Sequence, residues 1–351
     1  MQKSIVSFIP LGLLILFSLF IFSPCAAETE LSLDSTMFIE SGEAEAETSS
    51  LPTLQSKSDF PPLNAQGFLD EGEFVFEDTE KGIWRYCSET LRIEIFRKEQ
   101  DKPKEIWYEA EVWAANGEIF HMIPHDPEHR MSSLEYPYKI ARENKTVLAV
   151  NSDFAHLRIS QRSRPGILLR DGGIVSKQTI KSGSNTFPNL DTLALFPDGN
   201  MEVFLSDELD PEAYQTMGAL DVLAFGPYLI RDGILNESGL KKYGRSNAQR
   251  TAVGMIEKGH YMVMMLEGRH SNSKGGPISF LAEKLLEKGC VNAMNLDGGQ
   301  SSTILFMGKQ ICCVLNDYGR QASARKSAEI LGIGQSESVA DMDEKMSSVR
   351  P

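Results

Sequence analysis

Residues typical of metal centres are scarce in this 351-residue sequence, which contains 5 Cys and 6 His. It has no Cys-x-x-Cys pair and no Cys/His pattern with the spacing of a zinc site. The Gly-x-Ser-x-Gly nucleophile elbow, the Walker loop and the glycine-rich dinucleotide fingerprint are also missing. These absences disfavour a structural zinc protein, an α/β serine hydrolase, a P-loop nucleotidase and a dinucleotide-dependent enzyme.

Basic residues are nearly missing from the N-terminal side of the chain. Residues 28–80 contain 14 Asp and Glu against one Lys, within a chain of formal net charge −14. Between residues 81 and 335 the signs balance, with 31 acidic and 31 basic residues. Nucleic acid is not expected as a partner, because its binding requires clustered Lys and Arg. A neutral body still allows an anionic phosphodiester as substrate.

The first 27 residues have the pattern of a secretory signal. Lys3 precedes an apolar run over residues 9–22, and small residues lead to an expected cleavage after Ala27. We therefore expect an exported protein, either periplasmic or secreted. The alternative is an uncleaved membrane anchor, although the run is shorter than the ~20 apolar residues of a comfortable membrane span.

Three segments follow the predicted signal. Residues 28–70 are rich in Ser, Glu and Ala and lack periodicity, which predicts an acidic disordered leader. Residues 71–335 are expected to form one folded domain, and residues 336–351 a flexible tail. The four Cys after the signal are expected to be structural thiols or to form one disulfide.

Hydrophobic patterning predicts many strands and few helices in mixed order. This order favours an α+β fold, a single domain on one mixed sheet with a few helices. The expected strands lie at 91–97, 106–113, 146–150, 250–256, 260–266 and 291–296, with two more pairs within 166–175 and 191–205, and the expected helices lie at 136–144 and 278–288.

Four polar clusters lie in the loops of this pattern, at 151–154, 225–233, 250–254 and 295–303. In the fourth cluster a buried strand brings Asn295 and Asp297 to its carboxyl end. Gly298 and Gly299 then let backbone N–H groups approach a ligand closely, and the Ser301 hydroxyl adds a donor. This combination suits a sugar hydroxyl or a phosphodiester beside an acid, with a tight turn as the structural alternative.

A second carboxylate, Asp153, follows another buried strand, with Asn151 two residues before it. Two carboxylates from different strand ends, Asp153 and Asp297, can divide the acid and base or nucleophile roles of glycoside cleavage. Arg250 is a candidate clamp because its planar fork matches phosphate oxygens, with a structural salt bridge as the alternative.

Residues 146–334 resemble the phosphodiester glycosidase family. The resemblance is carried by NSDF at 151–154, GPYLIRDG at 226–233, RTAVG at 250–254 and NLDGG at 295–299. It implies a phosphodiester-glycosidase-like fold and hydrolysis of a sugar-1-phosphodiester. It also implies the site, with Asp297, Asp153 and Asn151 as catalytic residues and Arg250, Asn295, Gly298, Gly299, Ser301, Asp232, Arg231 and Arg320 as substrate-binding residues.

The sequence departs from the family pattern near this site. Ser152, Ala155 and Gln300 stand where the family usually has a Gly, a second aromatic and a third Gly. Ala155 and Gln300 favour the main alternative, a non-catalytic polysaccharide-binding or assembly protein on the same fold. A metal-dependent phosphodiesterase is the other alternative, because the carboxylates of the clusters could bind a divalent cation.

Histidines supply weaker candidates. His121, His125 and His129 repeat every four residues, but intervening prolines break a helix there, so we expect a polar loop rather than a metal face. His156 and His270 lie near the first and third clusters and are candidate proton shuttles.

The leading prediction is an exported hydrolase that cleaves sugar-1-phosphodiesters of envelope or extracellular polysaccharide. Its partner is then the sugar-phosphodiester or polysaccharide substrate, with membrane contact only through an uncleaved signal. No cofactor is expected to be required.

Overall fold

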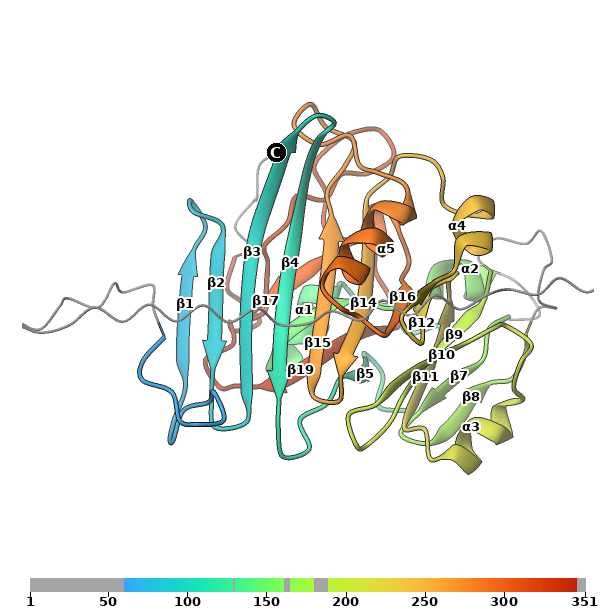
Figure 1. The fold of residues 1–351 in the computed structure, drawn as a ribbon, viewed down its shortest axis with the longest axis horizontal. Coiled ribbons are helices and arrows are strands. Elements are labelled where there is room, and N and C mark those ends of the chain that lie inside the picture. Colours follow the sequence, from blue (N-terminus) through green and yellow to red (C-terminus); the bar gives the residue numbers. More distant parts are fainter. Residues whose placement is uncertain (1–59, 129, 161–164, 180–188, 346–351) are drawn as a thin grey trace, which may run out of the picture. The chain divides into compact units, whose positions relative to one another are not determined.

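The computed structural model describes residues 60–128, 130–160, 165–179 and 189–345 of the chain. Within these residues the protein is mostly β, with short helices between the strands (Figure 1). The strands form three sheets, and all neighbouring strands run antiparallel. The expectation of one mixed sheet is therefore wrong, although many strands with few helices is what the pattern predicted.

The largest sheet contains nine strands, in the order β1 (Phe74–Asp78), β2 (Ile83–Cys87), β3 (Leu91–Asp101), β4 (Lys104–Ala114), β15 (His260–Leu266), β14 (Arg250–Glu257), β16 (Asn292–Asn295), β12 (Tyr228–Arg231) and β13 (Ile234–Leu235). The second contains β10 (Met201–Phe204), β9 (Asp191–Leu195), β11 (Asp221–Phe225), β7 (Leu168–Arg170) and β8 (Gly173–Ser176). The third contains β18 (Lys309–Gln310), β17 (Ile304–Phe306), β6 (Thr146–Asn151), β19 (Glu329–Gln335) and β5 (His121–Pro124).

The helices are short and lie on the outer faces of the sheets. They are α1 (Pro137–Glu143), α2 (Ala155–Ser160), α3 (Pro211–Met217), α4 (Glu237–Lys242) and α5 (Ile278–Glu287), with a 3₁₀ turn over Gly299–Ser301. Helix α5 buries Ile278, Leu281 and Leu285 against the largest sheet, as the helical spacing of these residues predicts (Figure 1). Helix α1 packs in the same way on the third sheet.

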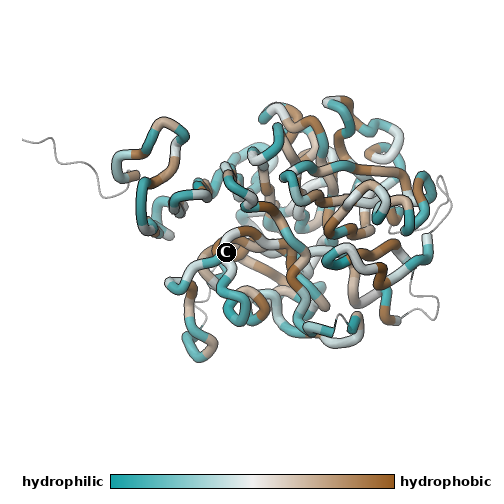
Figure 2. The backbone as a smooth tube through the Cα atoms, turned by 90° about the horizontal axis from the view of Figure 1, so that it is seen from below, coloured by the Kyte–Doolittle hydropathy of each residue, from teal (hydrophilic) through white to brown (hydrophobic). Residues whose placement is uncertain are grey.

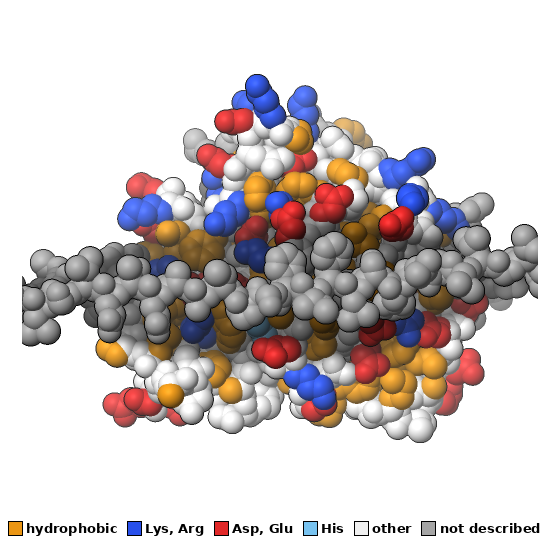
Figure 3. Space-filling model, viewed as in Figure 1, with side chains coloured by type: hydrophobic (Ala, Val, Ile, Leu, Met, Phe, Trp, Pro, Cys, Tyr) orange, Lys and Arg blue, Asp and Glu red, His pale blue; other side chains and the backbone are white. Residues whose placement is uncertain are grey.

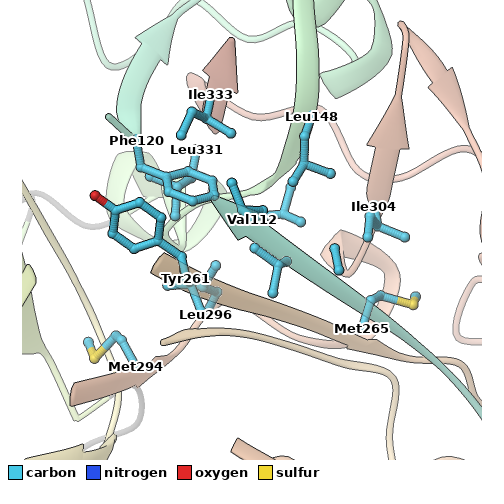
Figure 4. Packing of buried hydrophobic residues seen from close by; sticks show 14 of the residues in the cluster. Val112, Phe120, Leu148, Tyr261, Met265, Met294, Leu296, Ile304, Leu331 and Ile333 are labelled. Carbon is cyan, nitrogen blue, oxygen red and sulfur yellow. The ribbon is translucent and has the colours of Figure 1, made fainter. Parts of the chain in front are cut away.

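The main core lies between the inner faces of the largest and third sheets. Figure 4 shows Val112 and Met265 of the largest sheet on one side and Leu148, Ile304 and Leu331 of the third sheet on the other. Figure 2 shows hydrophobic segments inside the body and hydrophilic segments at its loops.

Strand β6 is buried at all six positions because both its faces are covered, one by this core and the other by α1. It delivers the first polar cluster at its carboxyl end.

The boundaries of the body differ from the predicted ones. The body includes Phe68 and Leu69, which are buried although the leader was predicted to reach residue 70. Residues 336–345, predicted as flexible tail, pack on the body, where Val339 is buried and Arg142 Nη1 donates to the Glu344 carbonyl at 2.6 Å. The predicted signal at 1–27 and the leader up to residue 59 lie outside the described residues.

The cysteines after the predicted signal are buried free thiols at Cys87, Cys290, Cys312 and Cys313. Of the two alternatives, structural thiols or one disulfide, they are therefore structural thiols, and burial raises the pKa of each thiol. They pack as small apolar side chains.

The histidine segment differs in part from the expected polar loop. His121 lies on β5, His125 follows that strand, and His129 lies outside the described residues. In the part of the chain that is described, three or more His, Cys, Asp or Glu side chains nowhere group so as to hold a metal ion. A search of the same residues found no helix with the length and apolar character needed to span a membrane.

Candidate active site

Two buried strands of different sheets end at the same place. Strand β6 ends at Asn151 and β16 ends at Asn295. The Asn151 side chain joins them, because its Nδ2 donates to the Asp297 carbonyl at 2.7 Å and its Oδ1 accepts from the Thr303 N–H at 3.0 Å. The Asp297 N–H in turn donates to the Ser152 carbonyl at 3.2 Å. The first and fourth clusters therefore form one site, as their positions after buried strands predict.

Asn295 attaches the second cluster to this site. Its Nδ2 donates to the Gly226 carbonyl at 2.9 Å, and its own carbonyl accepts from the Gly226 N–H at 3.3 Å. Asn151 and Asn295 are both buried and orient the backbone of the site, and Asn295 Oδ1 has no hydrogen-bond partner in the described residues.

Arg231 and Asp232 lie elsewhere. Strand β12 runs antiparallel to β16, so its end lies at the opposite end of β16 from Asn295. There the Asp232 N–H donates to Asn292 Oδ1 at 3.2 Å, and Arg231 forms a 2.8 Å ion pair with Glu208. The structure thus separates these two predicted substrate-binding residues from the other clusters.

Asp297 is the carboxylate of the site that is partly open to solvent. Burial raises its pKa from 3.8 to about 6, and the nearby charge of Asp153 adds to this increase. Hydrogen bonds from the Ser301 hydroxyl and from the Gly298 N–H, the latter at 2.9 Å, and the charge of Arg325 oppose it. Asp297 can therefore exchange a proton near neutral pH.

Asp153 has the opposite environment. It is fully buried and forms an ion pair with Arg158 of α2, which is also buried. The Arg158 guanidinium lies 4.9 Å from the centre of the Phe154 ring, and its Nε donates to the Pro165 carbonyl at 3.1 Å. The described residues thus hold Asp153 away from solvent, in contact with Arg158.

Arg250 begins β14 beside the glycine turn. Its guanidinium donates to the carbonyls of Gly244, Ser246 and Gly276 at 2.8–3.3 Å, which fixes its orientation. A Cβ added at Gly298 would lie 3.4 Å from its Nη1, so the turn passes directly over the guanidinium. Burial and the neighbouring charge of Arg269 lower its pKa to about 10, and the guanidinium stays charged at neutral pH.

Arg269 is a site residue that was not predicted from the sequence. A Cβ added at Gly299 would lie 3.1 Å from its Nη2, and Gly299 has the positive φ of 65° that favours glycine. Arg269 itself has φ 69°, so its backbone is strained. The signal available in the sequence was its position in the loop that follows buried β15.

Residues 319–325, which include Arg320 and which we call the closing segment, also contribute differently from the prediction. Arg320 is exposed in the loop after Leu315, whereas the arginine whose charge acts on Asp297 is Arg325. The Arg325 N–H donates to the Gln300 carbonyl, and the Gln300 side chain donates to the Ser323 carbonyl at 3.3 Å. Gln300, in place of the family's third glycine, thereby holds the closing segment.

Of the two candidate proton shuttles, the structure describes the side chain of His270. The side chain of His270 is 5% exposed, and its Nε2 lies 3.1 Å from Glu267 Oε2. The side chain of His156 lies outside what the structure describes.

The site thus combines one carboxyl group that titrates near pH 6, two guanidinium groups and a glycine turn between them. Guanidinium groups and exposed backbone N–H groups are the partners that phosphate oxygens prefer. Figure 3 shows Lys and Arg side chains interspersed with Asp and Glu on the visible face of the body, in keeping with its balanced charge.

Comparisons with known proteins support the family resemblance. A family model described as phosphodiester glycosidase matches residues 144–334. The SPbeta prophage-derived uncharacterized protein YomE of Bacillus subtilis (strain 168) is 27% identical over 174 residues, which are 49% of this chain and 26% of that protein. The match therefore spans about a quarter of the length of that relative.

A solved structure has a similar fold. It is the catalytic domain of zebrafish N-acetylglucosamine-1-phosphodiester alpha-N-acetylglucosaminidase, auto-inhibited by its pro-peptide. The match has a TM-score of 0.57 and 18% sequence identity, and it covers 71% of this chain and 85% of that chain. The resemblance predicted from the four clusters is confirmed.

Proposed function

We propose that this chain, which belongs to the phosphodiester glycosidase family, hydrolyses the bond between the anomeric carbon of a sugar and a phosphodiester oxygen. The observation that carries this proposal is the position of Asp297, with its pKa of about 6, at the end of a glycine turn flanked by Arg250 and Arg269. An acid beside a pair of phosphate-binding cations is the combination that this reaction needs.

Arg250 and Arg269, which lie on either side of the glycine turn, bind the phosphate oxygens. Asp297 donates its proton to the phosphate oxygen that leaves the anomeric carbon, the bond between that carbon and that oxygen breaks, and water adds to the carbon. The added water loses one proton to solvent, and Asp297 takes up a proton again from solvent, so the products are the free sugar and a phosphomonoester. The second pKa of a phosphomonoester is about 6, so Asp297 is well matched to this leaving group.

The two carboxylates divide the work by environment. Asp297 acts as the acid, while Asp153 is buried in its pair with Arg158, and its charge adds to the burial that raises the pKa of Asp297. In this proposal Asn151 and Asn295 act indirectly, by holding the backbone on both sides of Asp297.

The proposed substrate is a sugar-1-phosphodiester of envelope or extracellular polysaccharide. The name of the zebrafish relative makes N-acetylglucosamine the first sugar to test. We propose export because residues 1–27 have the pattern of a secretory signal. The proposed reaction requires no cofactor, since the proton, the positive charges and the water are all available without one.

The test is product analysis on a panel of sugar-1-phosphodiesters, with and without a chelator. Asp297→Asn should lower kcat by at least about 100-fold, the effect of removing a general acid. Arg269→Gln should raise KM. Asp232→Asn is the matched control, because this carboxylate lies at the other end of β16, and it should leave turnover unchanged.

Three results would overturn the proposal. Undiminished turnover by Asp297→Asn would show that Asp297 is not the general acid. Cleavage of the phosphate–alcohol bond that a chelator abolishes would establish the metal-dependent phosphodiesterase instead. Binding of the panel without turnover at high protein concentration would support the polysaccharide-binding alternative.

A further inference from the structure

One aromatic side chain beside the proposed site is unusually open. Tyr318 is 87% exposed, and among the exposed large hydrophobic residues of the described chain it is the one that is aromatic. It lies in the segment 315–321, which we call the Tyr318 loop. Leu315 and Gln321 pair as an isolated bridge that closes this loop, and the Asn316 N–H donates to the Arg320 carbonyl at 2.9 Å. The loop is therefore ordered although Tyr318 has little packing.

Gln249 connects the Tyr318 loop to the glycine turn. Its carbonyl accepts from the Gly299 N–H at 2.9 Å. Its side chain forms two hydrogen bonds with the backbone of Leu315, donating to the carbonyl at 2.9 Å and accepting from the N–H at 3.0 Å. Tyr318 is three residues beyond Leu315, so its Cα lies within about 10 Å of this anchor.

Arg269 lies between the two segments. Its Nη2 faces Gly299, while its Nη1 donates to the Leu315 carbonyl at 3.2 Å and its Nη2 pairs with Asp317 Oδ1 at 3.0 Å. In Figure 1 the loop that carries Arg269, between β15 and α5, and the loop after β18 both lie at the top of the view. Arg269 therefore joins the proposed phosphate site at the glycine turn to the Tyr318 loop.

We propose that the Tyr318 loop is the subsite for the alcohol half of the diester, and that Tyr318 stacks on the ring of a sugar in that half. The C–H face of a pyranose is apolar, and aromatic side chains supply the flat apolar surface it prefers. An exposed aromatic on an ordered loop provides this surface without rearrangement. The inference rests on the proposed function, because it assigns one side of the same site.

The experiment compares two substrates that differ only in the alcohol. Both are N-acetylglucosamine-1-phosphodiesters, one esterified with methanol and the other with the primary hydroxyl of a methyl hexoside. In the wild-type protein we expect kcat/KM to be higher for the hexoside diester. Tyr318→Ala should reduce the ratio of the two values about threefold to tenfold, the range expected for one aromatic contact. Tyr318→Trp and Tyr318→Phe should preserve it.

The control for a change in exposed apolar surface is Ile234→Ala. Ile234 is 71% exposed on β13, at the far end of β16, so its loss should leave the ratio unchanged. A ratio that Tyr318→Ala leaves unchanged, or that Tyr318→Phe reduces as strongly as Tyr318→Ala, overturns the stacking role.

Binding separates this inference from the proposed function. Titration calorimetry with Asp297→Asn, alone and combined with Tyr318→Ala, measures the affinity of each diester without turnover. A preference for the hexoside diester that disappears in the double variant supports the subsite even if wild-type protein hydrolyses neither compound. Equal affinity for the two diesters in Asp297→Asn overturns it even if both are hydrolysed.

Discussion

The pH dependence of the reaction should respond to a single hydroxyl group. Asp297 acts as an acid only while it is protonated, so kcat/KM should fall as pH rises through its pKa of about 6. The Ser301 hydroxyl donates to the ionised carboxylate and thereby lowers this pKa. Ser301→Ala should remove the hydrogen bond, raise the pKa and move the alkaline limb of the profile to higher pH.

The size of this movement follows from the environment of the carboxylate. A hydrogen bond to a charged group contributes about 1.5–3 kcal/mol, and 1.36 kcal/mol corresponds to one pH unit. Asp297 is partly exposed, so water replaces part of the lost bond. The limb should therefore move up by about 0.5–1 pH unit, from near pH 6 to near pH 6.5–7.

The assay is the kcat/KM profile for a sugar-1-phosphodiester between about pH 4 and pH 9, with Tm measured to check the fold. Ser302→Ala is the matched control, because Ser302 is a buried hydroxyl of the same turn whose Oγ has no hydrogen-bond partner in the described residues. A limb that stays in place in Ser301→Ala, moves to lower pH, or moves equally in Ser302→Ala would refute the assignment of Asp297.

Three further predictions concern the scaffold of the site. Gly299→Ala and Gly289→Ala should each destabilise the protein by about 1 kcal/mol, because both residues have positive φ. Activity assays should show a loss only for Gly299→Ala, because the added Cβ meets a guanidinium there. The Cβ added at Gly289 meets no atom within 4 Å. Arg158→Met should lower the free energy of unfolding by about 3–5 kcal/mol in denaturant titration, since it leaves a buried carboxylate unpaired; a loss below 1 kcal/mol would contradict a buried ion pair. Deleting residues 28–59 should leave Tm unchanged. Deleting residues 28–70 should lower the free energy of unfolding by roughly 3–6 kcal/mol, and therefore Tm, because it removes the buried side chains of Phe68 and Leu69. Equal Tm values for the two deletion variants would contradict this.

The convergence of the clusters was predictable because buried strands are visible in a sequence. The apolar run before Asn151 and the one before Asn295 each predicted a strand with a polar residue at its carboxyl end, and the structure has both as β6 and β16. Helical spacing likewise predicted α5. In each case the signal is local, since it depends on residues within one element.

The positions of Arg231 and Asp232 were not predictable in the same way. They belong to a motif that the resemblance links to the site, but β12 runs away from Gly226 and takes them to the other end of β16. The division into three sheets was hidden for a related reason, because a strand buried on both faces gives no alternating pattern that shows which sheet it joins.

The arginines of the site show why side-chain partners are the hardest part to predict. Arg269 and Arg325 each act on a group that lies far from them in sequence, so no spacing rule identifies them. Burial is the largest cause that raises the pKa of Asp297, the charge of Asp153 adds to it, and the charge of Arg325 opposes it. The acid role of Asp297 therefore depends on its burial and, to a smaller extent, on Asp153. A relative that retained Asp297 but lost Asp153 should have a lower Asp297 pKa and should lose activity at neutral pH first.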